Sequence, residues 1–351
     1  MESPRDSNKI RQKGPGARGK VAAALCAALL GGAAMTGCSD TGASGGSSGD
    51  LPRTASKKQL DGGSLAKDVD LKGAHFTVGS KEFTEQQILG KITLYALEAA
   101  GAKTKDQTGL QGTTIARSAL QSGDIDMYWD YSGTGWTQFL QHDKPVQGSA
   151  AQFGATSRED LKKHGIKWLG PAKFGNQYAM ARAADATGRA GEVDSISDLA
   201  KLAKDHPEDA TLCGASEFLD RELSALEQSP YKLKFQAPQV YQNAFALNFV
   251  NVAKGSPCKF AEVFTTDARL ESLDLNVLDD DKGHFTTELA ALTVRDKTAK
   301  KYPQLAKLSK ELGDALTEKT IIKLNGLVDL EGKSADQAAL YFLRTNGFIG
   351  K

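Results

Sequence analysis

The fold is decided by residues 75–101, which read HFTVGSKEFTEQQILGKITLYALEAAG. Residues 75–79 form a short apolar-rich run that predicts a buried strand. Thr84, followed by Gln87, matches a capping box at the start of a helix, and Gly101 marks the end of that helix. The apolar positions in between recur at the spacing of one helix face: Ile88, Ile92, Tyr95 and Ala99. The stretch therefore predicts a strand, a loop and a helix in succession.

The same alternation of strands and helices continues along the chain. Further strands are predicted at 125–129, 166–169, 177–182, 210–213, 261–265, 275–278 and 289–295, and helices at 113–121, 157–164, 197–204, 217–227 and 297–346. Strands separated by helices indicate mostly parallel sheets with helices on their faces, which is the α/β class. The length of 351 residues suits about two domains. We expect residues 71–174 and 273–351 to form a first lobe and residues 175–272 to form a second lobe inserted into it.

The N-terminus has the pattern of an export signal. A run of Lys and Arg precedes the apolar stretch Val21 to Ala34. This stretch has roughly 14 residues, short of the roughly 20 that a membrane-spanning helix needs. It ends in Met35-Thr36-Gly37-Cys38, which resembles the bacterial lipobox, whose cysteine is diacylated and becomes the new N-terminus. We expect residues 1–37 to be removed and Cys38 to carry lipid; the alternative is a plain signal peptide with an unmodified cysteine.

Residues 38–70 are rich in Gly, Ser, Asp and Lys, and this composition predicts a flexible tether. With the lipid on Cys38, the tether would hold the folded part at the membrane surface, on the extracytoplasmic face of the cell membrane. Two cysteines remain in the folded part, Cys213 and Cys258. Outside the cell they either form a disulfide or stay as separate buried thiols, because the sequence does not give their separation.

Charge and motif content exclude several functional classes. The net charge of +1 provides no basic excess for a nucleic-acid partner. The sequence contains no Gly-rich phosphate loop, no HExxH, no zinc-type cysteine spacing and no GxSxG elbow, and its five histidines show no paired metal spacing. We therefore predict no cofactor, no metal and no catalytic residue, so the protein is not expected to be an enzyme.

Five stretches resemble the substrate-binding component of osmoprotectant ABC importers, the family that takes up glycine betaine, choline, carnitine and related solutes. They are Val78-Gly-Ser-Lys-Glu-Phe-Thr-Glu-Gln86, Leu120 to Asp126 with Tyr131-Ser-Gly-Thr134, Asn176-Gln-Tyr-Ala179, Phe264-Thr-Thr-Asp267 and Leu278-Asp-Asp-Asp-Lys282. The resemblance implies a two-lobed type II solute-binding fold with a ligand cleft between the lobes. It also implies a small-molecule solute and ABC permease subunits in the membrane as partners, and we expect a monomer.

The resemblance also implies which residues bind the ligand. Tyr131 and Tyr178 fall on positions of the aromatic cage that holds a quaternary ammonium, and Thr134 falls on a polar position that fixes the other end of the ligand. Phe264 occupies a further cage position, where it keeps a ring but lacks a hydroxyl. Glu288 lies where the family commonly has Tyr, and Lys81 lies in a loop that faces ligand in some relatives.

The two charged residues make the predicted pocket less aromatic than is usual in the family. Buried charges are costly unless they are paired, so Lys81 and Glu288 would pair with each other or meet opposite charges on the ligand. We hypothesise that Lys81 meets a carboxylate and Glu288 an ammonium that still carries N–H donors; alternatively, one or both are exposed. The sequence does not identify the exact solute. Two alternatives also stay open: a receptor of the same fold for a different amine or amino-acid-like ligand, used in sensing or uptake, and an enzyme built on this scaffold.

Overall fold

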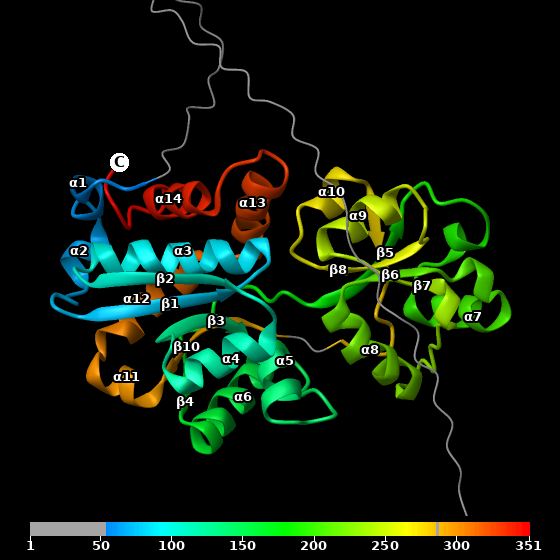
Figure 1. The fold of residues 1–351 in the computed structure, drawn as a ribbon, viewed down its shortest axis with the longest axis horizontal. Coiled ribbons are helices and arrows are strands. Elements are labelled where there is room, and N and C mark those ends of the chain that lie inside the picture. Colours follow the sequence, from blue (N-terminus) through cyan, green and yellow to red (C-terminus); the bar gives the residue numbers. More distant parts are fainter. Residues whose placement is uncertain (1–53, 286–287) are drawn as a thin grey trace, which may run out of the picture. The chain divides into compact units, whose positions relative to one another are not determined.

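The computed structural model describes residues 54–285 and 288–351 (Figure 1). The predicted signal segment 1–37, Cys38 and the tether up to residue 53 lie outside the described residues. Within the described part the chain forms two five-stranded sheets flanked by helices, which confirms the α/β class. Over the same residues, no helix combines the length and the apolar character needed to span a bilayer.

The first sheet has the strand order β2-β1-β3-β10-β4. Its strands are β1 (His75–Lys81), β2 (Lys103–Leu110), β3 (Met127–Tyr131), β4 (Ile166–Leu169) and β10 (Ala290–Arg295). Only β10 runs against its neighbours, so the sheet is mostly parallel. Figure 1 shows α3 (Thr84–Ala99) and α14 (Ala335–Thr345) on one side of this sheet, and α4 (Thr113–Ser122) and α6 (Ser149–His164) on the other.

The remaining C-terminal helices complete the first lobe. They are α11 (Asp296–Lys301), α12 (Gln304–Ala315) and α13 (Glu318–Asp329). A single buried core joins α3, the sheet and the C-terminal helices, with Ile88, Trp129 and Leu292 each at most 1% exposed. The predicted helical face of α3 therefore packs on this sheet, as the spacing of its apolar residues indicated.

The second sheet has the order β7-β6-β8-β5-β9. Its strands are β5 (Tyr178–Ala183), β6 (Leu212–Gly214), β7 (Val240–Gln242), β8 (Phe260–Phe264) and β9 (Leu275–Val277), and its main helices are α7 (Ile196–Asp205), α8 (Ser216–Gln228), α9 (Phe245–Ala253) and α10 (Arg269–Ser272). Only β5 is antiparallel to its neighbours. A buried disulfide joins Cys213 to Cys258, whose Cα atoms are 5.6 Å apart, so the first of the two open alternatives is the one found.

Two segments connect the lobes, one between β4 and β5 and the other between β9 and β10. They lie next to each other, because the amide of Ala172 donates to the carbonyl of Ala290 (2.7 Å) and the amide of Ala290 donates to the carbonyl of Phe174 (3.0 Å). Gly175 approaches the second segment so closely that a Cβ at this position would lie 1.9 Å from the carbonyl oxygen of Glu288. The strand that follows each connection is the antiparallel strand of its sheet: β5 in the second lobe and β10 in the first.

The structure differs from the sequence prediction at the lobe boundary and at the helix cap. Strand β9 pairs with β5, so the second lobe extends at least to Val277 and not only to residue 272. Phe83 is the N-cap of α3, and the Thr84 hydroxyl donates instead to Asp329 (2.7 Å), so the predicted capping box is wrong.

The predicted tether is also shorter than expected. Residues 57–60 and 64–68 form the short helices α1 (Lys57–Leu60) and α2 (Ser64–Asp68), and Leu65 is fully buried in the first core. This region is fixed to the C-terminal end of the chain. The amide of Gly350 donates to the carbonyl of Gln59 (2.6 Å), and the amide of Ser64 donates to the carbonyl of Gly347 (3.0 Å).

Candidate functional site

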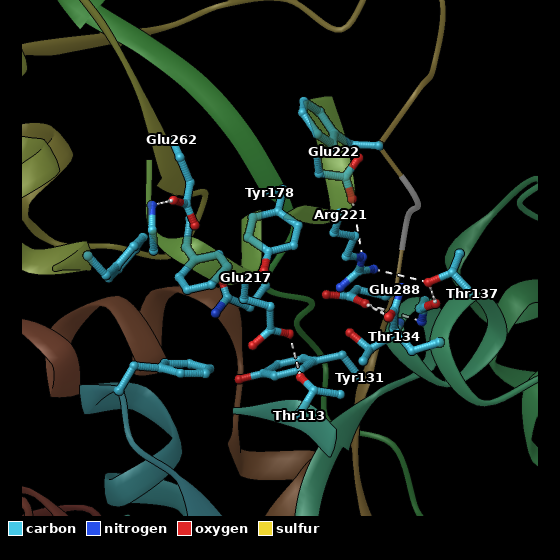
Figure 2. A pocket seen from close by; sticks show the side chains of 18 of the residues that line it. Thr113, Tyr131, Thr134, Thr137, Tyr178, Glu217, Arg221, Glu222, Glu262 and Glu288 are labelled. Atoms are coloured by element: carbon cyan, nitrogen blue, oxygen red, sulfur yellow. Dashed lines mark hydrogen bonds and ion pairs between the residues drawn. The ribbon is translucent and has the colours of Figure 1, made fainter. Parts of the chain in front are cut away.

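A cavity of about 1470 Å³ is lined by residues of both lobes. This volume exceeds the roughly 300–1,000 Å³ of most small-molecule sites, so a solute of betaine size would fill only part of it. The cavity brings together all six residues that the sequence singled out: Lys81, Tyr131, Thr134, Tyr178, Phe264 and Glu288. Figure 2 shows Tyr131, Tyr178 and Glu288 around the same space, although they come from three separate parts of the chain.

Aromatic rings form one wall of the cavity. The ring of Phe264 stacks on that of Tyr178 with 5.1 Å between centroids, and it lies 5.2 Å from Phe83 and 4.6 Å from Phe245. Phe83 in turn stacks near Tyr131, at 6.5 Å. The rings thus form a continuous wall from the first lobe to the second, and ring faces attract a cation that has no hydrogen to donate.

Tyr131 is held in place by a buried carboxylate. Its hydroxyl donates to Glu85 (2.6 Å), which also accepts hydrogen bonds from Thr266 (2.7 Å) and Asn325 (3.1 Å). Burial raises the pKa of Glu85 above its usual value, against the lowering effect of these three donors. Glu85 thereby ties together β3, α13 and the segment after β8, so the aromatic wall has a rigid support at the first lobe.

Lys81 has a different partner from the ones expected. Its ammonium lies 3.1 Å from Asp130 and donates to Thr113 (3.1 Å), and both members of the ion pair are buried. Asp130 also accepts a hydrogen bond from the Tyr128 hydroxyl (2.5 Å). The predictions that Lys81 pairs with Glu288 or is exposed are therefore wrong, and its charge is already compensated by the protein.

Glu288 is buried at the edge of the cavity. One of its carboxylate oxygens accepts from the amides of Gly133 (3.1 Å) and Thr134 (3.3 Å), at the start of α5 (Ser132–Thr134). Burial raises the pKa of this carboxyl to about 8, although the charges of Arg221 and Lys81 lower it. The alternative that Glu288 is an exposed surface charge is wrong, since only 7% of the residue is accessible.

Arg221 is a second charged group of the site, and the sequence analysis missed it. It lies on α8, and its guanidinium donates to the Thr137 hydroxyl (3.0 Å), lies 3.2 Å from Glu222 and is 5.3 Å from the Tyr178 ring centroid. The other partly buried arginine of the cavity, Arg269, is held by both oxygens of Asp267. Arg221 is also paired, but only through its Nε to one oxygen of Glu222, whereas Arg269 contacts both oxygens of Asp267 and Lys81 is buried against Asp130. Arg221 is therefore the better placed of the three to bind a carboxylate from a ligand.

Helix α8 also links the two lobes across the cavity. Glu217, one turn before Arg221, accepts a hydrogen bond from the Thr113 hydroxyl (2.7 Å). Deeper in the second lobe, Glu262 accepts from the amide of Ala215 (2.6 Å), and burial raises its pKa to about 8. Among residues 54–285 and 288–351, no group of histidine, cysteine, aspartate and glutamate side chains is arranged to hold a metal ion.

Two α/β lobes with an aromatic and polar cavity between them define the class of two-lobed solute-binding proteins. The chain belongs to the family described as the substrate binding domain of ABC-type glycine betaine transport systems, whose model matches residues 74–345. This agrees with the resemblance found in the sequence. The family and the fold are those of binding proteins and not of enzymes.

Individual relatives support the same assignment. The glycine-betaine-binding protein of Pseudomonas aeruginosa is 32% identical over 78% of this chain and 88% of its own length. The ergothioneine transport permease/binding protein EgtU of Helicobacter pylori is 29% identical over 77% of this chain, which spans about half (47%) of that longer protein. Among solved structures, apo YehZ of Escherichia coli has 27% identity and a TM-score of 0.58, over 79% of this chain and all of that one.

Proposed function

We propose that this protein is the solute-binding component of an ABC importer and that it binds a small betaine-like zwitterion in the cavity between its lobes. The observation that carries the proposal is the convergence of Tyr131, Tyr178 and Phe264 on one cavity, with Arg221 beside them. The cationic group of the solute would lie against the rings, and its carboxylate would meet Arg221. Relatives named for glycine betaine and ergothioneine binding favour this ligand class.

We further propose that the mature protein is a monomer held at the extracytoplasmic membrane surface by lipid on Cys38. The motif around Cys38 and the preceding apolar stretch support this location. The anchor would keep the binding lobes near permease subunits in the same membrane. Mass spectrometry of the mature N-terminus tests the anchor: an acylated Cys38 is expected, and an unmodified N-terminus at another residue would contradict it.

Calorimetric titration of the purified protein with glycine betaine, choline, carnitine and ergothioneine tests the binding function. We expect at least one of these solutes to bind. The variant Tyr178→Leu keeps an apolar side chain but removes a ring face, and a desolvated cation–π contact contributes about 2 kcal/mol, so affinity should fall roughly thirtyfold. Tyr341→Leu, on α14 and outside the cavity, is the matched control. Equal affinities of the two variants would contradict the aromatic binding site.

A further inference from the structure

The carboxylate of Glu288 occupies a position where an aromatic side chain would serve a fully methylated ammonium better. Its buried oxygen is fixed by the amides of Gly133 and Thr134, so the side chain cannot turn to solvent without losing both hydrogen bonds. A buried carboxylate is stabilised chiefly by hydrogen-bond donors, and a quaternary ammonium has none. A methylated cation would keep the charge attraction but would hold its nitrogen away from the oxygen by the radius of a methyl group.

Glu288 and Arg221 both form hydrogen bonds with the same short turn of the first lobe, at residues 133–137. Arg221 donates to the Thr137 hydroxyl, and that hydroxyl donates to the carbonyl of Gly133, whose own amide donates to Glu288. Figure 2 shows the Arg221 and Glu288 side chains directed toward each other at this turn. The arrangement places a guanidinium and a carboxyl close together. Burial raises the pKa of this carboxyl to about 8, and the positive charge of a bound zwitterion would favour its ionised form, which accepts a hydrogen bond from the ligand.

We propose that Glu288 accepts a hydrogen bond from an N–H group of the solute, so that the site prefers a betaine-like zwitterion that carries an N–H over one that carries none. This inference rests on the proposed function and narrows its ligand class. The N–H belongs either to an incompletely methylated ammonium or to a nitrogen heterocycle attached to the betaine. A site built to accept a hydrogen bond discriminates against an analogue without the donor, because the analogue leaves a buried acceptor unpaired.

The test compares betaine-like solutes with and without an N–H. Glycine betaine has three N-methyl groups and no N–H, N,N-dimethylglycine has one N–H on the ammonium, and ergothioneine has a heterocyclic N–H beside a trimethylammonium group. A hydrogen bond to a charged group corresponds to a factor of about ten or more in affinity. We therefore expect N,N-dimethylglycine or ergothioneine to bind the wild-type protein at least about tenfold more tightly than glycine betaine.

Two variants assign this preference to Glu288. In Glu288→Gln the amide oxygen can still accept from Gly133 and Thr134, while its NH₂ faces the ligand and cannot accept, so the preference should disappear. In Glu288→Tyr the preference should reverse toward glycine betaine. Asp185→Asn, which removes an exposed carboxylate outside the cavity, is the control and should leave the ratio unchanged. Thermal unfolding of each variant establishes that it is folded.

The outcomes separate the two proposals. If glycine betaine binds the wild-type protein as tightly as both N–H solutes, or if the preference survives in both Glu288 variants, the role of Glu288 is refuted while the binding function stands. If no zwitterion binds the wild-type protein, the proposed function itself fails. The wild-type ratio alone is enough to overturn the inference, even if one variant does not fold.

Discussion

Replacement of Lys81 by methionine should destabilise the protein strongly, because it leaves the charge of Asp130 buried without its partner. Asp130 is fully inaccessible, and the Lys81 side chain is 5% exposed. Breaking a buried ion pair by removing one partner costs about 3–5 kcal/mol, whereas removing both charges is often close to neutral. We therefore expect Lys81→Met to lose about 3–5 kcal/mol of unfolding free energy. The double variant Lys81→Met/Asp130→Asn should recover most of that loss.

Urea denaturation without ligand, followed by circular dichroism, measures these free energies. The control is Lys310→Met, which breaks an exposed pair with Asp314 (2.5 Å) on α12 and should cost at most about 1 kcal/mol. The reasoning is refuted if Lys81→Met is as stable as the control and the double variant brings no recovery. If solute affinity also fell more than tenfold in such a stable Lys81→Met protein, Lys81 would be a ligand-binding group, as the sequence analysis had expected.

Three further predictions concern the second lobe and the connections. Replacing Cys213 and Cys258 together by alanine should cost about 4 kcal/mol of unfolding free energy, from the entropy of closing a loop between cysteines 45 positions apart in the sequence; an unchanged urea midpoint would contradict this. Since the pKa of Glu262 is raised to about 8 in the folded state, the stability that its protonated form provides is fully present below the unfolded value of 4.5 and is lost as the pH rises through 8. The unfolding free energy should therefore fall from pH 5 to pH 8, and Glu262→Gln should make that fall smaller by roughly a few kcal/mol. If the unfolding free energies of both proteins had the same dependence on pH, this role of Glu262 would be excluded. Gly175→Ala places a methyl group against the carbonyl of Glu288, so the connecting segment must shift. Solute affinity measured by calorimetry should drop about tenfold or more. Unaltered affinity would show that the segment can shift without changing the binding site.

The sequence predicted the elements of the fold better than their assignment to sheets. Apolar spacing gave α3, and alternation gave most of the strands and helices, since both patterns depend on neighbours in the chain. Strands β2 and β7 and helix α9 were not predicted, and the predicted helix at 297–346 is divided into α11, α12, α13 and α14. Strand β9, at Leu275–Val277, was assigned to the wrong lobe. Three residues carry little pattern of their own, and their pairing with residues 181–183 of β5 shows which sheet they join. Such pairing is a tertiary property that one sequence does not display.

The partner of Lys81 could have been predicted from the sequence only if the register between the two strands had been known. In the structure Val78 aligns with Met127 on the parallel strands β1 and β3. Counting three residues along each strand brings Lys81 level with Asp130, the residue directly before the predicted cage tyrosine. A buried Lys and a buried Asp at equivalent positions on adjacent strands would have indicated an ion pair before any ligand was considered.

The site was predicted where family motifs mark it and missed where the two lobes meet. Tyr131, Tyr178 and Phe264 all line the cavity. Phe83, the N-cap of α3, lies inside the quoted motif at 78–86 but was not singled out as a site residue, and neither was Arg221 on α8. Their roles depend on the distance between lobes, which local sequence patterns do not encode.

The hydrogen bond between Gly350 and Gln59 has a practical consequence for how the protein can be handled. The first helical turns and the last residues belong to the same lobe. An affinity tag, a fluorophore or a surface attachment next to either of these segments is therefore attached to the first lobe and not to the second. The second lobe is joined to this lobe only through the two connecting segments described above, among the residues that the structure describes. An immobilised protein labelled on α7 would thus report solute capture as a change in distance from a fixed reference point.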